Sequence, residues 1–147
     1  MTMEKFRYLP HTADVRFMAY GRSFGEALEN SALALLNLML DVKRIEKYRS
    51  VSRAVAISES ADTESELAWF TLQDILSRID SRKLNAYSFK ISSLKRGAKG
   101  GSVLRGRLLF KNTAADNALL SVKAVTPHDL AVKRHKRYVS INVVVDV

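Results

Sequence analysis

The 147-residue sequence contains no cysteine, and it has only six glycines and two prolines. The absence of cysteine excludes disulfide scaffolds, zinc–thiolate sites, iron–sulfur clusters and cysteine nucleophiles. No apolar run approaches the roughly 18–20 residues of a membrane span, and no apolar signal segment is visible near residue 1. We therefore expect a cytoplasmic protein in which residues 1–147 form one domain.

Acidic residues are scarce in the second half of the chain. Residues 1–80 hold 10 Lys and Arg against 12 Asp and Glu, whereas residues 81–147 hold 14 against 3. The first part is nearly neutral and the second carries a net charge of +11. Such asymmetry is typical of a surface that meets nucleic acid or an acidic partner, and a solvated basic face that keeps the protein in solution explains it equally well.

The hydrophobic pattern predicts an α+β fold. Ser23 and Thr63 each begin a capping box of the form S/T-x-x-E, followed by apolar residues at helical spacing. Alternating apolar residues predict strands before, between and after these two helices. The order is β-β-α-β-α and then a run of strands, which favours two helices packed on a largely antiparallel or mixed sheet. The strands are expected at 6–8, 15–20, 51–57, 87–94, 103–110, 119–125, 131–133 and 137–147.

Two acidic positions stand out at the ends of strands. His11-Thr12-Ala13-Asp14 connects the first two strands, where a His and an Asp could converge as a metal site or an acid–base pair. An Asx turn, in which Asp14 bonds nearby amides, explains the same residues. Asp146 and the carboxylate of Val147 form a group of hard oxygens that suits Ca²⁺ or Mg²⁺, with a frayed end as the alternative. If Asp14 lies beside Asp146, the crowded carboxylates need a cation or basic side chains to neutralise them.

Basic residues gather in two stretches near the C-terminus. One follows the predicted hairpin around residues 95–102 and includes Arg105, Arg107 and Lys111. The other is Lys133, Arg134, Lys136 and Arg137, which forms a candidate RNA or partner surface, with Tyr138 as a stacking ring. Thr126-Pro127-His128-Asp129 is best explained as a turn, although its His and Asp could also serve a site.

No familiar catalytic motif accompanies these residues. The glycines at 97–101 do not form a Walker A loop, and neither G-x-S-x-G nor H-E-x-x-H is present. RNP1, KH and helix-turn-helix signatures are missing as well. We therefore do not expect an enzyme that carries a complete catalytic apparatus of its own.

Several segments taken together resemble the archease family over the whole length of the chain. They are Pro10-His11-Thr12-Ala13-Asp14, Glu66-Leu67-Ala68-Trp69, the stretch from Val122 to Leu130, and the terminal Asp146-Val147. The resemblance implies a small non-catalytic α+β protein that activates the RtcB-type RNA ligase of tRNA splicing. In that role it promotes guanylylation of the ligase and multiple turnover.

The resemblance also implies a metal site. The family's ligands match Asp14, Asp146 and Val147, and the cation is often Ca²⁺, with Mg²⁺ or Mn²⁺ as alternatives. His11 matches a family histidine and is expected as a neighbour of the site rather than as a ligand. The sequence departs from the family pattern at Pro127, where an aromatic residue is usual.

Two further departures concern charge, because Arg107 stands where many members have Glu and because this chain is basic where many members are acidic. These differences affect the expected partner surface and not the metal positions. Two hypotheses remain open on the sequence: a metal-bearing activator of an RNA ligase, and a standalone RNA-binding module that uses the basic C-terminal half. A metal-dependent hydrolase is weaker, because no general base and nucleophile pair is evident.

Overall fold

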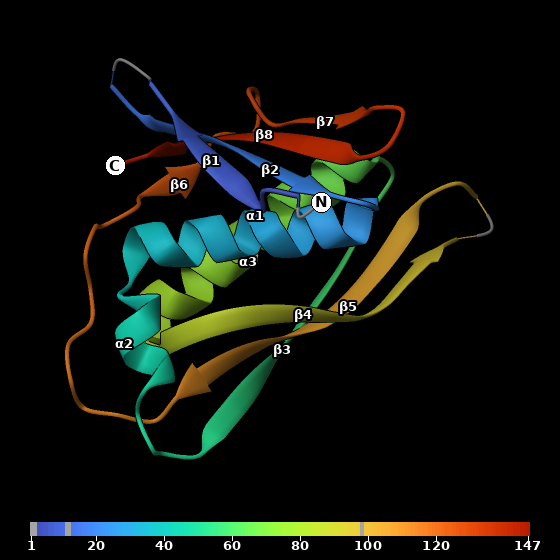
Figure 1. The fold of residues 1–147 in the computed structure, drawn as a ribbon. Helices are drawn as coiled ribbons and strands as arrows, with labels where there is room; N and C mark the ends of the chain where they lie inside the picture. Colours follow the sequence, from blue (N-terminus) through green and yellow to red (C-terminus); the bar gives the residue numbers. More distant parts are fainter. Residues whose placement is uncertain (1–2, 11–12, 98) are drawn as a thin grey trace.

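The computed structural model describes residues 3–10, 13–97 and 99–147. Its helices lie in a layer between two antiparallel sheets (Figure 1). The helices are α1 (Phe24–Met39), α2 (Val42–Glu46) and α3 (Glu64–Arg82). The strands are β1 (Phe6–Leu9), β2 (Val15–Gly21), β3 (Ser52–Ala61), β4 (Asn85–Arg96), β5 (Ser102–Lys111), β6 (Ala124–Val125), β7 (Ala131–Arg134) and β8 (Val139–Asp146).

The prediction of an α+β fold is confirmed, and the structure adds detail to it. The strands form a five-stranded sheet, ordered β1-β2-β8-β6 with β7 also pairing with β8, and a three-stranded sheet ordered β3-β5-β4. The short helix α2 was not predicted. It begins after Asp41, whose side chain accepts a hydrogen bond from the Arg44 amide.

The two capping boxes begin α1 and α3 as predicted. The Ser23 side chain accepts a hydrogen bond from the Glu26 amide at 3.2 Å, and Thr63 does the same for Glu66 at 3.1 Å. Each cap satisfies an amide that would otherwise lack a partner at the helix start. The side chains therefore define where both helices begin.

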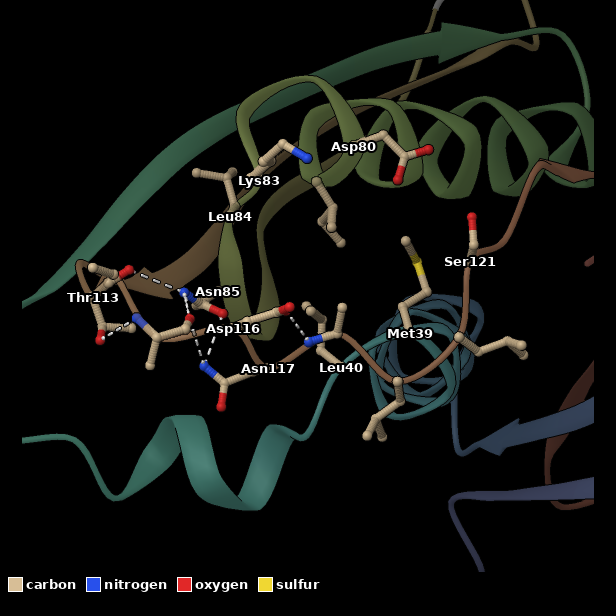
Figure 2. Close-up of a pocket in the computed structure, with 16 residues that line it drawn as sticks. Met39, Leu40, Asp80, Lys83, Leu84, Asn85, Thr113, Asp116, Asn117 and Ser121 are labelled. Carbon is tan, nitrogen blue, oxygen red and sulfur yellow. Dashed lines mark hydrogen bonds between the residues drawn. The ribbon is translucent and has the colours of Figure 1, made fainter.

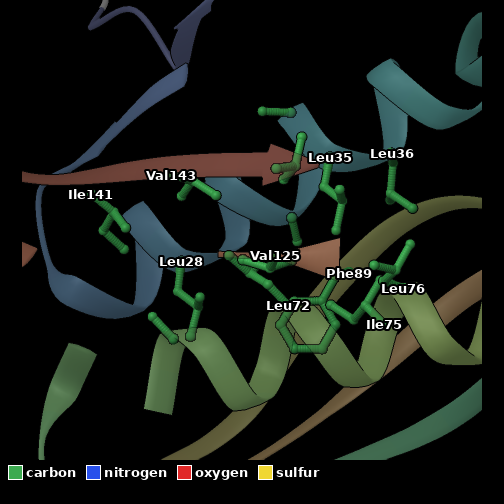
Figure 3. Packing of buried hydrophobic residues seen from close by; sticks show 14 of the residues in the cluster. Leu28, Leu35, Leu36, Leu72, Ile75, Leu76, Phe89, Val125, Ile141 and Val143 are labelled. Carbon is green, nitrogen blue, oxygen red and sulfur yellow. The ribbon is translucent and has the colours of Figure 1, made fainter. Parts of the chain in front are cut away.

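Helix α1 is buried on two sides, as its broad apolar stripe indicates. It packs against β2 and β8 in one sheet and against β4 in the other. Figure 3 shows Leu28 and Leu35 of α1 among side chains from β8, α3 and β4. One continuous core thus joins the two sheets through the helices.

The predicted strand at 119–125 is shorter in the structure, where only Ala124–Val125 pairs as β6. The Leu119 amide donates to the Met39 carbonyl oxygen at 2.8 Å, and residues 113–117 before it are held by side-chain amides. Asn85 Nδ2 donates to the carbonyl oxygens of Thr113 and Ala115, and Asn117 Nδ2 donates to Asn85 Oδ1 at 3.0 Å. These bonds satisfy the backbone without strand pairing.

Gly21 ends β2 where the first turn of α1 comes closest. A Cβ at Gly21 would lie 2.2 Å from the Ala27 amide nitrogen, which is a clash with backbone. We predict that Gly21→Ala lowers the free energy of unfolding by about 1–3 kcal/mol or more, as overpacking does. Gly25→Ala is the control, because the nearest atom to its added Cβ would be Leu94 Cδ2 at 3.6 Å, and this substitution should be neutral or stabilising. Equal loss in both variants, measured by urea unfolding, would contradict the packing argument.

Glu59 of β3 faces α3 beside Asp74 and Arg78. Burial, followed by the hydrogen bond and the charge of the Asp74 carboxylate, raises the pKa of Glu59 to about 7, and Arg78 partly opposes the shift. Because the native state then binds more protons than the unfolded chain, stability should fall as pH rises from about 4.5 to 7. We predict that Glu59→Gln removes this part of the fall, measured as unfolding free energy at pH 5 and pH 8. The exposed Glu46→Gln is the control, and an unchanged pH profile in Glu59→Gln would refute the assignment.

Candidate functional site

The pairing of β2 with β8 brings two predicted site residues to one end of the five-stranded sheet. The register runs from Gly21 opposite Val139 to Val15 opposite Val145. Asp14 precedes Val15 in the bend before β2, and Asp146 follows Val145 as the last residue of β8, so both lie next to the final pair of this ladder.

The face on which these carboxylates lie is the outer one. Val145 and Val143 are fully buried and point to the helices, so the alternate positions Asp146 and Val144 point away from them. Asp146 is exposed and Asp14 is half-buried. Figure 1 shows the C-terminus beside β6, at the same end of the sheet.

Strand β6 pairs with β8 next to Asp146. Ala124 pairs with Asp146, and the Lys123 amide donates to the Asp146 carbonyl oxygen at 2.8 Å. The Thr126 hydroxyl donates to Asp146 Oδ1 at 3.4 Å. Sequence analysis did not single out Thr126 as a neighbour of Asp146, because only the β6–β8 pairing brings them together.

We name this group of Asp14, Asp146 and Val147 the carboxylate end of the sheet. Within residues 3–10, 13–97 and 99–147, no three His, Cys, Asp or Glu side chains gather closely enough to hold a metal ion. The predicted neighbour His11 lies outside the described residues.

A chain of hydrogen bonds secures the turn beside the carboxylate end. Arg16 Nε donates to Asn142 Oδ1 at 2.6 Å, and Asn142 Nδ2 donates to the Asp129 carbonyl oxygen at 2.8 Å. The prediction of a turn at Pro127–Asp129 is confirmed, and His128 is exposed in it. The polar residues on the outer face of β2 and β8 thus position the segment that carries Thr126.

The predicted basic surface lies at the other end of β8. Lys133 and Arg134 belong to β7, and Arg134 pairs in register with Val139 at the start of β8. Since β8 spans eight residues, this end is roughly 20–25 Å from Asp146. Arg134 forms an ion pair with Glu64, and His135 stacks on the Tyr138 ring with centroids 4.3 Å apart. The structure does not bring the basic surface and the carboxylate end together.

A hollow of about 610 Å³ lies between the C-terminal ends of α1 and α3 and the segment 113–121 (Figure 2). Its amide groups are engaged within the chain, since Asn117 bonds Asn85 and also accepts from the Tyr48 hydroxyl at 3.2 Å. Asp116 accepts from the Ala118 amide at 3.0 Å. We assign these polar groups to holding the irregular segment.

The family model described as "Archease protein family (MTH1598/TM1083)" matches residues 6–147. The chain belongs to the archease family. The match covers all the strands and helices described above, including both halves of the carboxylate end. The recognition made from the sequence motifs is confirmed.

Proteins named archease show the same relationship at full length. The chain is 30% identical over 147 residues to the archease of Sulfolobus acidocaldarius, covering 99% of this chain and 100% of the relative. It is 32% identical to that of Archaeoglobus fulgidus, covering 97% and 99%.

Two solved structures share the fold. The solution structure of protein 1598 from Methanobacterium thermoautotrophicum superposes with a TM-score of 0.79 at 24% identity, covering 99% of this chain and 100% of that one. A crystal structure from Thermotoga maritima (TM1083), described as an archease and possible chaperone, has a TM-score of 0.52 at 21% identity, covering 100% and 99%. Among the described helices, none is long and apolar enough to cross a membrane.

Asn142 is the residue whose loss should loosen this part of the archease fold most specifically. We predict that Asn142→Ala lowers the free energy of unfolding by about 1–3 kcal/mol, because the Arg16 guanidinium and the Asp129 carbonyl each lose a partner. Asn37→Ala is the matched control, since Asn37 Nδ2 bonds only the Leu33 carbonyl oxygen within α1. Chemical unfolding of both variants tests this, and a loss in Asn37→Ala as large as in Asn142→Ala would speak against it.

Proposed function

We propose that this archease-family protein is a non-catalytic activator of an RtcB-type RNA ligase in the cytoplasm, where it promotes ligase guanylylation and multiple turnover during tRNA splicing. The observation that carries the proposal is the β2–β8 ladder, whose last pair, Val15 with Val145, is followed directly by Asp14 on one strand and by the exposed Asp146 on the other. Membership of the family over residues 6–147 supports it. The carboxylate end is the part of the molecule that would meet the ligase.

We further propose that the carboxylate end holds a divalent cation, Ca²⁺ or alternatively Mg²⁺ or Mn²⁺. The donor set fits, because the carboxylates of Asp14 and Asp146 and the carboxylate of Val147 are hard oxygens. A cation held between two carboxylates would also offset the repulsion between their charges. When bound, the cation would neutralise these carboxylates and present a positive centre to a partner.

The carboxylate end differs in charge from the rest of the C-terminal half of the chain. Residues 81–147 carry a net charge of +11, yet the last two residues contribute only negative charge. Asp146 and Val147 are both exposed. An acidic, cation-holding end on a basic protein is chemically distinct from the rest of the surface, which suits contact with one defined region of a partner.

A second candidate function is a standalone RNA-binding module. The observation that favours it is the turn between β7 and β8, where Lys133, Lys136 and Arg137 are exposed. None of these three forms an ion pair with the part of the chain that the structure describes. This candidate predicts that their removal weakens RNA binding while the aspartate variants have little effect.

A guanylylation assay separates the two candidates. An RtcB-type ligase from the same source is mixed with GTP and metal, without RNA, in the presence and absence of this protein. The wild type should increase the guanylylated fraction of the ligase, and Asp14→Asn should lose at least about tenfold of the stimulation, which corresponds to 1.4 kcal/mol. Asp129→Asn, an exposed carboxylate outside the proposed ligand set, is the control. No stimulation by the wild type, or full stimulation by Asp14→Asn, would overturn the activator proposal.

Thermal unfolding tests the cation without any ligase. We predict that Ca²⁺ raises the Tm of the wild type, with about 2.7 kcal/mol of stabilisation at a concentration 100 times the Kd. Asp146→Asn should abolish the shift, yet be at least as stable as the wild type in chelator because one opposed charge is gone. Asp129→Asn should respond like the wild type. If Ca²⁺, Mg²⁺ and Mn²⁺ all leave the wild-type Tm unchanged, the site does not bind a divalent cation.

A further inference from the structure

The outer face of the three-stranded sheet carries a row of cations along its central strand. In β5 the residues Leu104, Gly106 and Leu108 are buried toward the helices, so the alternate positions point away from them. Those outward positions are Val103, Arg105, Arg107, Leu109 and Lys111. No helix packs on this side, since α1 and α3 both lie between the sheets (Figure 1).

Strand β4 extends the positive charge sideways. Lys90 is directly opposite Arg107, and Lys95 is opposite Val103. Lys90, Arg105 and Arg107 are exposed, and none of them forms an ion pair with the described residues. Like charges directly opposed across strands are destabilising, so an anionic partner at Lys90 and Arg107 would relieve repulsion.

Within β3, β4 and β5, no acidic side chain lies on the same face as these cations. The three strands contain a single carboxylate, Glu59, which is opposite the buried Leu104 and faces α3. The outward positions of the neighbouring strand β3 hold only small side chains, all exposed: Ser52, Ala54, Ala56, Ser58 and Ser60. We call the exposed cations of this face, Lys90, Arg105 and Arg107, the cationic ridge. Beside it, the outward side chains of β3 are small and include serine hydroxyls.

We propose that this face binds single-stranded RNA through its phosphate backbone. Alternate residues of a strand lie about 6.6–6.8 Å apart, so Arg105 and Arg107 make a line along which one phosphate chain can run. Arginine binds phosphate through two parallel hydrogen bonds, and serine hydroxyls are common phosphate contacts. One line of cations can contact one phosphate backbone, whereas an RNA duplex presents two backbones.

An acidic protein is the competing occupant, and the composition of the face disfavours it. Protein interfaces usually have a central apolar patch with aromatic anchors. On β5 the outward positions hold two large apolar side chains, Val103 and Leu109, and on β3 they hold none. One aromatic ring, Tyr87 of β4, lies against Lys111 and hydrogen-bonds the Ser52 hydroxyl. Phosphate contacts of this type fix a strand without reading its bases, so binding should be independent of sequence.

The inference does not depend on the proposed ligase activation and is tested apart from it. Fluorescence anisotropy with a labelled 12-nucleotide oligo(U) compares the wild type with the variant K90Q/R105Q/R107Q. We expect at least tenfold weaker binding at moderate salt, and a plot of log K against log[salt] that is shallower by about 2, since each lost phosphate contact removes about 0.7. K133Q/K136Q/R137Q removes the same charge from the β7–β8 turn and should bind within twofold of the wild type.

A conservative variant keeps the test meaningful if the triple variant folds poorly. R105K/R107K retains the charge and should keep most of the salt dependence. Three results would overturn the proposal: no binding of oligo(U) by the wild type, an equal loss in both triple variants, or tighter binding of a polyglutamate peptide or duplex RNA than of oligo(U). Stimulation of guanylylation without RNA should be unchanged in K90Q/R105Q/R107Q, so failure of one proposal is distinguishable from failure of the other.

Discussion

The antiparallel pairing of β2 with β8 is the interaction on which the rest of the structure depends. It joins segments more than 110 residues apart in the sequence and places β8 at the centre of the five-stranded sheet. The inward side chains Phe17 and Ile141, both fully buried, then pack on α1. Beyond the last pair of this ladder, Val15 with Val145, come Asp14 and Asp146. A slip of one residue would turn every side chain of one strand to the other face, so the core and the carboxylate end are fixed by the same register.

The position of the helix layer gives the molecule two outward sheet faces. Because α1 and α3 are covered by a sheet on each side, both sheets turn a face outward. One outer face ends in carboxylates, and the other carries the cations of β5 and β4. The separation keeps opposite charges from neutralising one another within the chain, which leaves each available for a different partner.

Local signals in the sequence were sufficient for much of the fold. The capping boxes at Ser23 and Thr63 and the alternation in 139–147 predict elements that the structure contains. The division into two sheets could not be predicted, because it depends on pairing between distant strands. Helix α2 is only five residues long, and the segment before β6 is held by Asn85 and Asn117, neither of which produces a periodic pattern. For the site, strand ends singled out Asp14 and Asp146, but their alignment and the Thr126 contact follow only from the observed register.

The central claim is that the carboxylate end is a divalent-cation site, and paramagnetic NMR with Mn²⁺ tests it most directly. Substoichiometric Mn²⁺ added to the isotopically labelled protein broadens amide signals near the bound ion. The account predicts selective broadening at residues 13–16, 124–126 and 144–147, reversed by excess Ca²⁺ and lost in Asp146→Asn. Broadening centred elsewhere, or none at these residues, would contradict it.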